Sequence, residues 1–341
     1  MSRISRRDFL KLSGLALAGL AFSPFLPESS AFEATEFVRV ATHWVSVYKE
    51  PNDQSEIITS WPRDTILPIY EVVNSGTPDY NPIWYRVFGG YMHRARLQRI
   101  RPAYNTPLTQ VPETRLLGEV TVPYVQPYTY KAGEGWRPFW FRLYYSTIHW
   151  INAVEAGPDG QPWYQILDEA DKTLYYYVPA THIRPIAPEE MTPISPETTN
   201  KWIDINLRRQ ELVCYEGNTE VYRAKISSGL RYVYDTPTGR FHIQSKHPSR
   251  RMNAADLAAS DDENVLAGVP WCCFFTDKGH ALHGTYWHDN FGMTMSHGCV
   301  NLTNEDAKWL FRWSRPVAPF EEIDRRSLDK RGFGTLIDIH Y

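Results

Sequence analysis

The stretch His283-Gly-Thr-Tyr-Trp-His-Asp-Asn-Phe-Gly-Met-Thr-Met-Ser-His-Gly-Cys-Val-Asn301 gives the chain its first interpretable feature. It places one cysteine, Cys299, among three histidines. A free cysteine has a pKa of about 8.5, so only a few per cent is thiolate at neutral pH, and a nearby imidazole that takes the proton raises the reactive fraction. The stretch therefore predicts a nucleophilic cysteine with a histidine as its base.

Three histidines could serve Cys299. His297 lies two residues before it, and residues i and i+2 of an extended segment point to the same side, although the glycine between them loosens that geometry. His288 lies in the intervening loop. His283 has the strongest strand context, because the apolar run 269–275, a turn at 276–279 and the segment 280–283 read as a hairpin that ends at this histidine. The alternative is that Cys299 is a small buried hydrophobic residue and the histidines are hydrogen-bonded loop residues.

The motif decides between these interpretations. His283-Gly284, a spacer and then Ser296-His-Gly-Cys-Val-Asn301 resemble the signature of the L,D-transpeptidase (YkuD-type) catalytic domain, in which a histidine and a small residue precede Ser/Thr-His-Gly-Cys, an apolar residue and Asn or Arg. Ser228-Gly229 and the turn Thr236-Pro-Thr-Gly239 also lie where this resemblance expects them, although a purely structural turn explains the second equally well.

The resemblance implies a mechanism and a set of site residues. Cys299 is the expected nucleophile, His283 the proton donor and acceptor, and the Gly284 carbonyl the group that orients His283. The amides of Gly298 and Cys299 are the nearest candidates for stabilising an oxyanion. The remaining site residues are expected to shape the catalytic loop or to contact substrate, and they are His297, Ser296, Asn301 and Tyr286.

The implied substrate is peptidoglycan. Cys299 would attack a donor tetrapeptide stem, form a thioester and pass the acyl group to the amine of a second stem, giving the 3-3 cross-links of a wall that maintains cell shape. No cofactor and no metal are expected. The same thioester could instead go to water, as in an L,D-carboxypeptidase, or to a protein that becomes attached to the wall. An alternative from another class is a wall-binding protein without catalytic activity.

Residues 1–31 are interpreted as an export signal. Ser5-Arg-Arg-Asp-Phe-Leu-Lys11 matches the twin-arginine pattern, and 12–25 is an apolar run shorter than the about 20 residues that a membrane span needs. Ser29-Ser-Ala31 offers small residues to a signal peptidase. We therefore expect twin-arginine export to the periplasm or to the cell wall and extracellular face, with no membrane span after the signal is removed.

Composition favours a mainly β protein. Twenty-five prolines, 20 glycines and 14% aromatic residues are typical of many short strands and turns. A formal charge of −3 indicates no nucleic-acid partner. The other cysteines, Cys214, Cys272 and Cys273, are not needed as a disulfide framework in a chain of this size, and the adjacent pair is expected to pack on opposite faces of a strand.

Residues 36–102 and 115–186 read as two copies of one β module. Each contains a Trp-Tyr-polar-apolar strand, at 84–87 and 163–166, and a later strand that ends in Ile-Arg-Pro. These segments resemble bacterial SH3-like modules. The paired aromatic residues are expected in the core rather than on a ligand-binding surface, and they are Trp84, Tyr85, Trp163 and Tyr164.

Residues 187–198 form a proline-rich linker and 199–341 the β-rich catalytic domain. Because prolines fix φ and remove donors, we expect a stiff spacer without regular structure, and a break near 190 should not cut a shared core. The domain should contain strands at 202–207, 211–215, 221–227 and 335–340. Residues 246–268 are expected to be a loop or lid. Thr303 should cap a helix that buries Ala307, Leu310, Phe311 and Ser314 and ends before Pro316.

Overall fold

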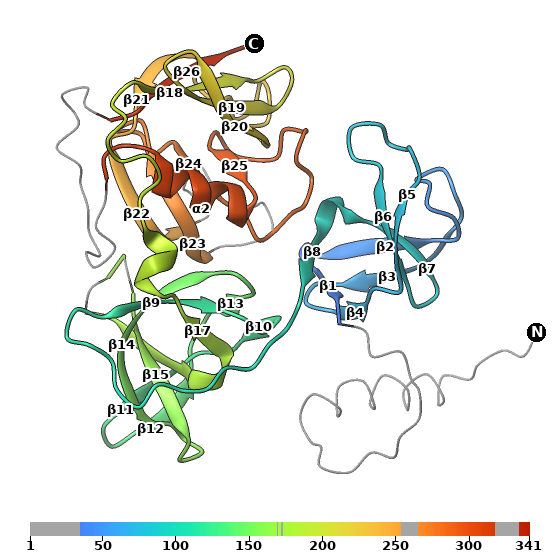
Figure 1. The fold of residues 1–341 in the computed structure, drawn as a ribbon. Coiled ribbons are helices and arrows are strands. Elements are labelled where there is room, and N and C mark those ends of the chain that lie inside the picture. The colour runs from blue at the N-terminus through green and yellow to red at the C-terminus, as the bar shows by residue number, and fades with distance from the viewer. Residues whose placement is uncertain (1–34, 169, 172, 254–264, 318–333) are drawn as a thin grey trace, which may run out of the picture. The chain divides into compact units, whose positions relative to one another are not determined.

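The computed structural model describes residues 35–168, 170–171, 173–253, 265–317 and 334–341 (Figure 1). The expected export signal, residues 1–31, lies outside them. The described chain is mainly β-structure, and its α-helix is α2 (Asn304–Trp313). Residues Thr35–Tyr341 form one compact unit.

The first module consists of two antiparallel sheets. The smaller has the order β4-β1-β8 and the larger the order β3-β2-β7-β6-β5. Alternate residues of β1 and β2 supply Val38, Val40 and Val47 to the module's core. The SH3-like barrel remains a prediction. The elements are β1 (Phe37–Val40), β2 (Trp44–Tyr48), β3 (Ile57–Pro62), β4 (Ile66–Pro68), β5 (Glu71–Asn74), β6 (Ile83–Val87), β7 (Gly90–His93), the 3-10 turn η1 (Arg94–Arg96) and β8 (Leu97–Ile100).

The second module is built around a larger sheet of order β12-β11-β16-β15-β14-β9-β17, with a separate pair β10-β13. Its core is lined by Val120, Leu143, Ile166 and Val178, among others. The elements are β9 (Leu116–Val120), β10 (Tyr124–Val125), β11 (Tyr128–Lys131), β12 (Gly135–Pro138), β13 (Leu143–Tyr144), β14 (Ile148–Ala156), β15 (Pro162–Leu167), β16 (Tyr175–Pro179), the 3-10 turn η2 (Ala180–His182) and β17 (Ile183–Pro185).

The two modules share the order of elements that the sequence repeat predicts. In each, the Trp-Tyr strand, β6 or β15, is followed by a strand, a 3-10 turn and a last strand. The four paired aromatic residues are all buried, so their predicted core role is confirmed. Trp84 also satisfies its indole nitrogen by donating to the Thr77 carbonyl at 2.7 Å, as a buried tryptophan requires.

The linker is more structured than its prolines suggested. Residues Pro188–Met191 form a 3-10 turn, η3, and Met191 is buried in the largest core cluster. Glu190 accepts hydrogen bonds from Arg184 and Lys308, on either side of the linker in sequence. The expectation of a spacer without regular structure is therefore wrong here, because the segment makes its own packing and ionic contacts.

The C-terminal part, residues 199–341, has two sheets in the described residues. The first has the order β20-β19-β18-β26-β21, in which β18 and β26 are parallel neighbours, and the second has the order β22-β23-β24-β25. The predicted strands at 202–207, 211–215, 221–227 and 335–340 are found within a few residues. The strands are β18 (Lys201–Asn206), β19 (Glu211–Glu216), β20 (Thr219–Lys225), β21 (Gly239–His242), β22 (Ser245–Asn253), β23 (Val265–Phe274), β24 (Ala281–Gly284), β25 (Val300–Leu302) and β26 (Leu336–His340).

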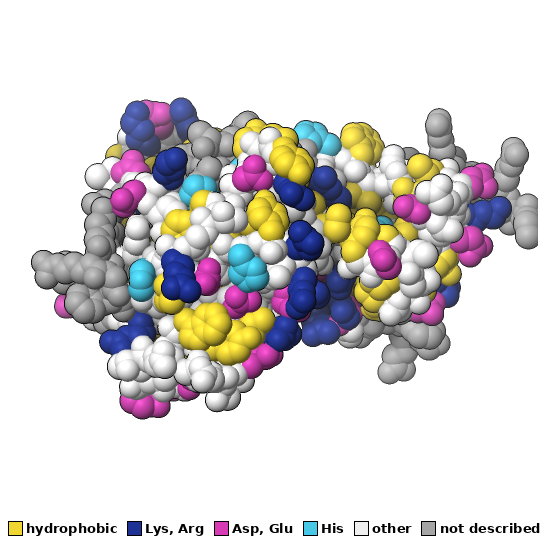
Figure 2. Space-filling model, turned by 90° about the horizontal axis from the view of Figure 1, so that it is seen from above, with side chains coloured by type: hydrophobic (Ala, Val, Ile, Leu, Met, Phe, Trp, Pro, Cys, Tyr) yellow, Lys and Arg dark blue, Asp and Glu magenta, His cyan; other side chains and the backbone are white. Residues whose placement is uncertain are grey.

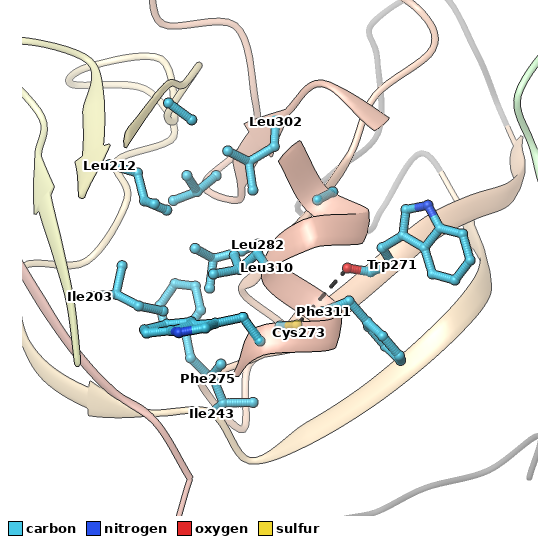
Figure 3. Packing of buried hydrophobic residues seen from close by; sticks show 14 of the residues in the cluster. Ile203, Leu212, Ile243, Trp271, Cys273, Phe275, Leu282, Leu302, Leu310 and Phe311 are labelled. Atoms are coloured by element: carbon cyan, nitrogen blue, oxygen red, sulfur yellow. Dashed lines mark hydrogen bonds between the residues drawn. The ribbon is translucent and has the colours of Figure 1, made fainter. Parts of the chain in front are cut away.

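Helix α2 forms as predicted and packs against β23, β24 and β25 (Figure 1). The Thr303 hydroxyl caps it by accepting from the Asp306 amide at 3.1 Å. The helix ends at Trp313, and its predicted inner stripe is buried. Figure 3 shows Ile203 and Leu212 of the first sheet pointing toward Leu310 of the helix. The helix thus fixes the strands that carry the motif residues.

Residues 246–268 are not simply a loop, which corrects the prediction. Residues 245–253 form β22 and 265–274 form β23, paired antiparallel, while 254–264 lie outside the described residues. The polar residues of β22 did not predict a strand, because the groups that satisfy them lie far away in the sequence. Lys246 donates to carbonyls at the end of α2, and the Ser249 hydroxyl donates to the Ile148 carbonyl of β14.

The largest core cluster crosses the linker. It joins Leu117, Ile148 and Trp150 of the second module to Ile203 and Leu310 of the C-terminal part. The expectation that a break near residue 190 leaves no shared core is therefore wrong. Cys272 and Cys273 do lie on opposite faces of β23, one in each of two core clusters, as the sequence predicted.

The described surface mixes charged and apolar groups. Figure 2 shows hydrophobic side chains in separate groups between charged ones on the face that it draws. Trp44 and Trp140 are the most exposed tryptophans among the described residues, at 63% and 62%. None of the described helices is long and apolar enough to cross a membrane.

Candidate active site

Two parallel strands bring the motif residues together. His283 of β24 is the direct neighbour of Asn301 in β25, and Cys299 comes just before β25. Residues two apart in a strand share a face, so Ala281 and His283 lie on one side of β24. The Sγ of Cys299 accepts from the Ala281 amide at 3.4 Å and donates to the Gly279 carbonyl at 3.8 Å, so these hydrogen bonds are to backbone groups at and before β24 and not to His283 Nε2. His283 lies two residues after Ala281 in the strand, which separates their Cα atoms by roughly 7 Å.

The tautomer of His283 is fixed by its neighbour. Nδ1 lies 2.8 Å from the Gly284 carbonyl oxygen, which can only accept a hydrogen bond, so Nδ1 carries the proton and Nε2 presents a lone pair. Nε2 is buried and has no hydrogen-bond partner. Burial lowers the pKa of His283 to about 4, although the bond to Gly284 opposes that shift. The imidazole is therefore neutral at pH 7, with its lone pair on Nε2.

His288 is less suited to act as the base, because both of its ring nitrogens are engaged. Nδ1 accepts from the Asn290 amide at 3.3 Å, and Nε2 lies 2.9 Å from the side-chain amide of Asn301. Burial lowers its pKa to about 3. The unpartnered Nε2 of His283 makes His283 the better candidate of the two, and the identity of the base remains a prediction.

The turn before Cys299 is held by hydroxyl groups. The Ser296 hydroxyl donates to the Cys299 carbonyl at 2.5 Å and accepts from the Gly298 amide at 3.1 Å. Gly298 has φ of 121°, which favours glycine at this position. Because its amide already donates to Ser296, Gly298 can stabilise an oxyanion only by giving up that bond.

Thr236 is a contact of this turn that sequence reasoning treated as structural. Its hydroxyl donates to the Gly298 carbonyl and accepts from the Gly229 amide, both at 2.9 Å. The Thr-Pro-x-Gly pattern marked the turn. The hydrogen bond from the Thr236 hydroxyl to the Gly298 carbonyl follows only from the tertiary fold.

The other two predicted residues lie in different surroundings. The ring of His297 packs on Tyr234, with centroids 4.1 Å apart. Tyr286 is buried, stacks on Tyr144 and donates its hydroxyl to the Ala267 carbonyl at 3.2 Å. These contacts give Tyr286 a packing role, and its contact with substrate remains a prediction.

Two pockets are lined by residues near the motif in sequence, and neither of them is lined by Cys299 or His283. One pocket of about 290 Å³ is lined by Thr285, His288 and Asn304 together with Gln98 and Tyr145 from the two modules. Another of about 220 Å³ is lined by Ser228, Gly229 and Thr236. Cys299 and His283 themselves are fully buried. Among the residues described, no group of three or more His, Cys, Asp or Glu is placed to hold a metal ion.

Comparison with known proteins assigns this region. Residues 200–321 match the family model of the L,D-transpeptidase catalytic domain, YkuD. The chain thus contains a catalytic domain of the YkuD type. The match covers both His283 and Cys299.

Individual relatives share the same part of the chain. The "Probable L,D-transpeptidase YbiS" of Escherichia coli (strain K12) is 27% identical over 146 residues, 43% of this chain and 40% of the relative. The "Probable L,D-transpeptidase 3" of Mycobacterium tuberculosis is 29% identical over 85 residues, 24% of this chain and 31% of the relative. An L,D-transpeptidase structure from Mycobacterium smegmatis aligns with 42% of this chain and 59% of its own, at 18% identity and a TM-score of 0.32. The chain therefore spans less than half the length of these two curated relatives.

Proposed function

We propose that the protein is an exported peptidoglycan L,D-transpeptidase that forms 3-3 cross-links through a thioester on Cys299. The observation that carries this proposal is the state of His283. Its Nδ1–H is held by the Gly284 carbonyl, its Nε2 has no hydrogen-bond partner, and its strand neighbour Asn301 lies two residues after Cys299. A neutral imidazole with an available lone pair, on the strand next to the one that Cys299 precedes, is the kind of base that a thiol nucleophile needs for acyl transfer.

The reaction has two halves. Cys299 Sγ attacks the carbonyl carbon between the third residue of the donor stem and D-Ala, while its proton passes to His283 Nε2. The tetrahedral intermediate collapses, the C–N bond breaks, and the imidazolium returns the proton to the departing D-Ala amine. In the second half the side-chain amine of another stem attacks the thioester and loses a proton to Nε2, and the sulfur leaves and recovers its proton. Atoms and charge balance without a cofactor.

Acylation tests the nucleophile. Incubation of the full-length protein with a stem tetrapeptide or a carbapenem should add one acyl mass to Cys299, detected by mass spectrometry of the peptide that contains it. Cys299→Ser should fold and lose the adduct, because an alkoxide is far harder to generate than a thiolate. Activity above about a hundredth of wild type would count against covalent catalysis by this residue.

A comparison of two histidines tests the base. His283→Ala should lower the acylation rate by about 10²- to 10⁴-fold, the usual contribution of a general base. His288→Ala should cost less, because both nitrogens of His288 are already engaged in the loop. A larger loss in His288→Ala would assign the proton transfer to the other imidazole.

The products identify the acceptor. Cross-linked dimers joined between third residues indicate transpeptidation, a released tripeptide indicates an L,D-carboxypeptidase, and a wall fragment on a protein amine indicates protein attachment. Tight binding of insoluble peptidoglycan with no adduct on Cys299 would replace the enzyme with a wall-binding protein.

Export is proposed from the sequence alone. Changing Arg6 and Arg7 together to lysine should leave the precursor in the cytoplasm, because the twin-arginine pathway reads the arginine pair itself. Fractionation of cells that express each form measures this. Normal export of the double variant would indicate the general secretory route.

A further inference from the structure

The segment between the catalytic histidine and the catalytic turn is held by the first module, residues 36–102. Arg39 of β1, whose side chain is 1% exposed, donates to the Tyr286 carbonyl at 3.3 Å. The Ala95 carbonyl accepts from the Asp289 amide at 2.9 Å. These bonds link residues about two hundred positions apart in sequence. They hold the segment 286–290 near each of its ends.

Asn81 makes the densest of these contacts. Its Nδ2 donates to the Asp289 carbonyl at 3.0 Å and to Asn290 Oδ1 at 2.9 Å, and its Oδ1 accepts from Arg94 Nε at 2.5 Å. The side chain is fully buried. Both hydrogens of the amide are therefore used on the catalytic segment, while the bond from Arg94 keeps the amide in this orientation.

A buried chain of hydrogen bonds continues from Asn81 to the strand that carries the base. The backbone amide of Asn290 donates to His288 Nδ1, so the neutral His288 carries its proton on Nε2. That nitrogen faces the side-chain amide of Asn301 at 2.9 Å, and an amide rotated to present Oδ1 accepts the Nε2–H. Asn301 is the direct strand neighbour of His283.

The segment also touches the base directly. The Trp287 ring lies 5.8 Å from the ring of His283, centroid to centroid. A change in the backbone of 286–290 thus reaches His283 through Trp287 and, by way of His288, through Asn301. Catalytic groups lose rate steeply when they are displaced, with a misplacement of about 1 Å costing about 10²-fold.

We propose that Arg39 and Asn81 are positioning residues for the reaction. Through them the first module, residues 36–102, helps to set the geometry of the active site. They fix the segment 286–290, and this segment sets the orientation of His288, Asn301 and His283. The inference rests on the proposed function of Cys299 and His283, and goes beyond it by assigning a catalytic purpose to a module outside the family match at 200–321.

The test uses Asn81→Ala, Asn290→Ala and the double variant in the full-length chain. Cys299 acylation by a carbapenem is followed over time by mass spectrometry. Asn81→Ala should slow acylation by about 10- to 100-fold. The double variant should lose less than the product of the two single losses, because both single changes remove the same Asn81–Asn290 bond.

Val87→Ala is the matched control. Val87 is buried in the core cluster of the first module, and the change removes apolar volume while leaving the Asn81 and Arg39 bonds in place. Its acylation rate should stay within about twofold of wild type. A drop as large as that of Asn81→Ala would mean that acylation reports only the stability of the module, and would overturn the proposal.

The side-chain ¹⁵N spectrum of His288 gives a readout that does not depend on acylation. Wild type should show a neutral imidazole protonated on Nε2, and Asn81→Ala should show a mixture of tautomers or broadened signals. Unchanged His288 signals, or a wild-type acylation rate in Asn81→Ala, would overturn the positioning role. If wild type is never acylated, the proposed function fails instead, and the His288 spectrum alone decides this inference.

Discussion

Lys246→Met would test how helix α2 is fixed behind the active site. The side chain of Lys246 is buried, and its Nζ donates to three carbonyls at the C-terminal end of α2, those of Phe311, Ser314 and Pro316. Methionine keeps most of the length of the stem and loses all three bonds. Because α2 packs on β24 and β25, a loosened helix end also loosens the strands that carry the motif.

The magnitude follows from two opposing effects. Hydrogen bonds to a charged donor contribute about 1.5–3 kcal/mol each, so three give at least about 4.5 kcal/mol. Against this, burial lowers the pKa of Lys246 from 10.5 to about 8, and that difference of about 2.5 units costs about 3.4 kcal/mol at neutral pH, which methionine avoids. The carbonyls left without a donor add a further loss. We expect Lys246→Met to be about 2–4 kcal/mol less stable at pH 7.

The pH dependence has a definite sign. Between pH 8 and 10.5 the unfolded wild type holds a proton on Lys246 that the folded protein has released, so its free energy of unfolding rises with pH relative to the variant. The difference in free energy of unfolding between wild type and Lys246→Met should widen by roughly 3 kcal/mol over this range. Urea unfolding at pH 7 and pH 10 measures both effects, with the exposed Lys278→Met as control, expected within about 0.5 kcal/mol of wild type.

Two results would refute this reasoning. Equal stability of Lys246→Met and wild type at pH 7 would mean that desolvation of the ammonium cancels the three hydrogen bonds. A gap that stays constant from pH 8 to 10.5 would mean that burial does not lower the pKa of this lysine.

The remaining predictions concern three other sites. Burial lowers the pKa of His149 to about 3, so below about pH 6.5 the unfolded chain binds a proton that the folded protein does not, and the free energy of unfolding should decrease as the pH is lowered. Between pH 7 and pH 5, unfolding experiments should show wild type losing about 2 kcal/mol more than His149→Gln. Thr303→Ala removes the cap on the Asp306 amide and should cost about 1 kcal/mol in urea unfolding, while Thr303→Ser should retain most of it. Thr236→Val removes the hydroxyl that holds the Gly298 turn and should slow Cys299 acylation about tenfold, and equal rates for Thr236→Val and Thr236→Ser would contradict that role.

Local patterns in the sequence were sufficient for several parts of the protein. The turn at 276–279 joins two short apolar runs, and the resulting pairing of β23 with β24 is found. The hydroxyl and acids at 303–306 begin a helix whose apolar spacing buries the predicted face. The motif around Cys299 indicated the catalytic domain that the family match covers. In the first two cases the decisive residues lie within one turn or one helix of each other, where spacing alone fixes geometry, whereas the motif was recognised by its residue pattern.

Contacts between distant residues were decided only by the tertiary structure. The polar segment 245–253 is a strand because Lys246 and Ser249 find carbonyl partners far along the chain. The linker carries Met191 into a core shared with the second module. Asn81 and Arg39 reach the catalytic segment only after the modules have packed. A buried polar side chain is stable only with a partner, and the sequence shows the need for that partner without showing which distant group the fold will bring to it.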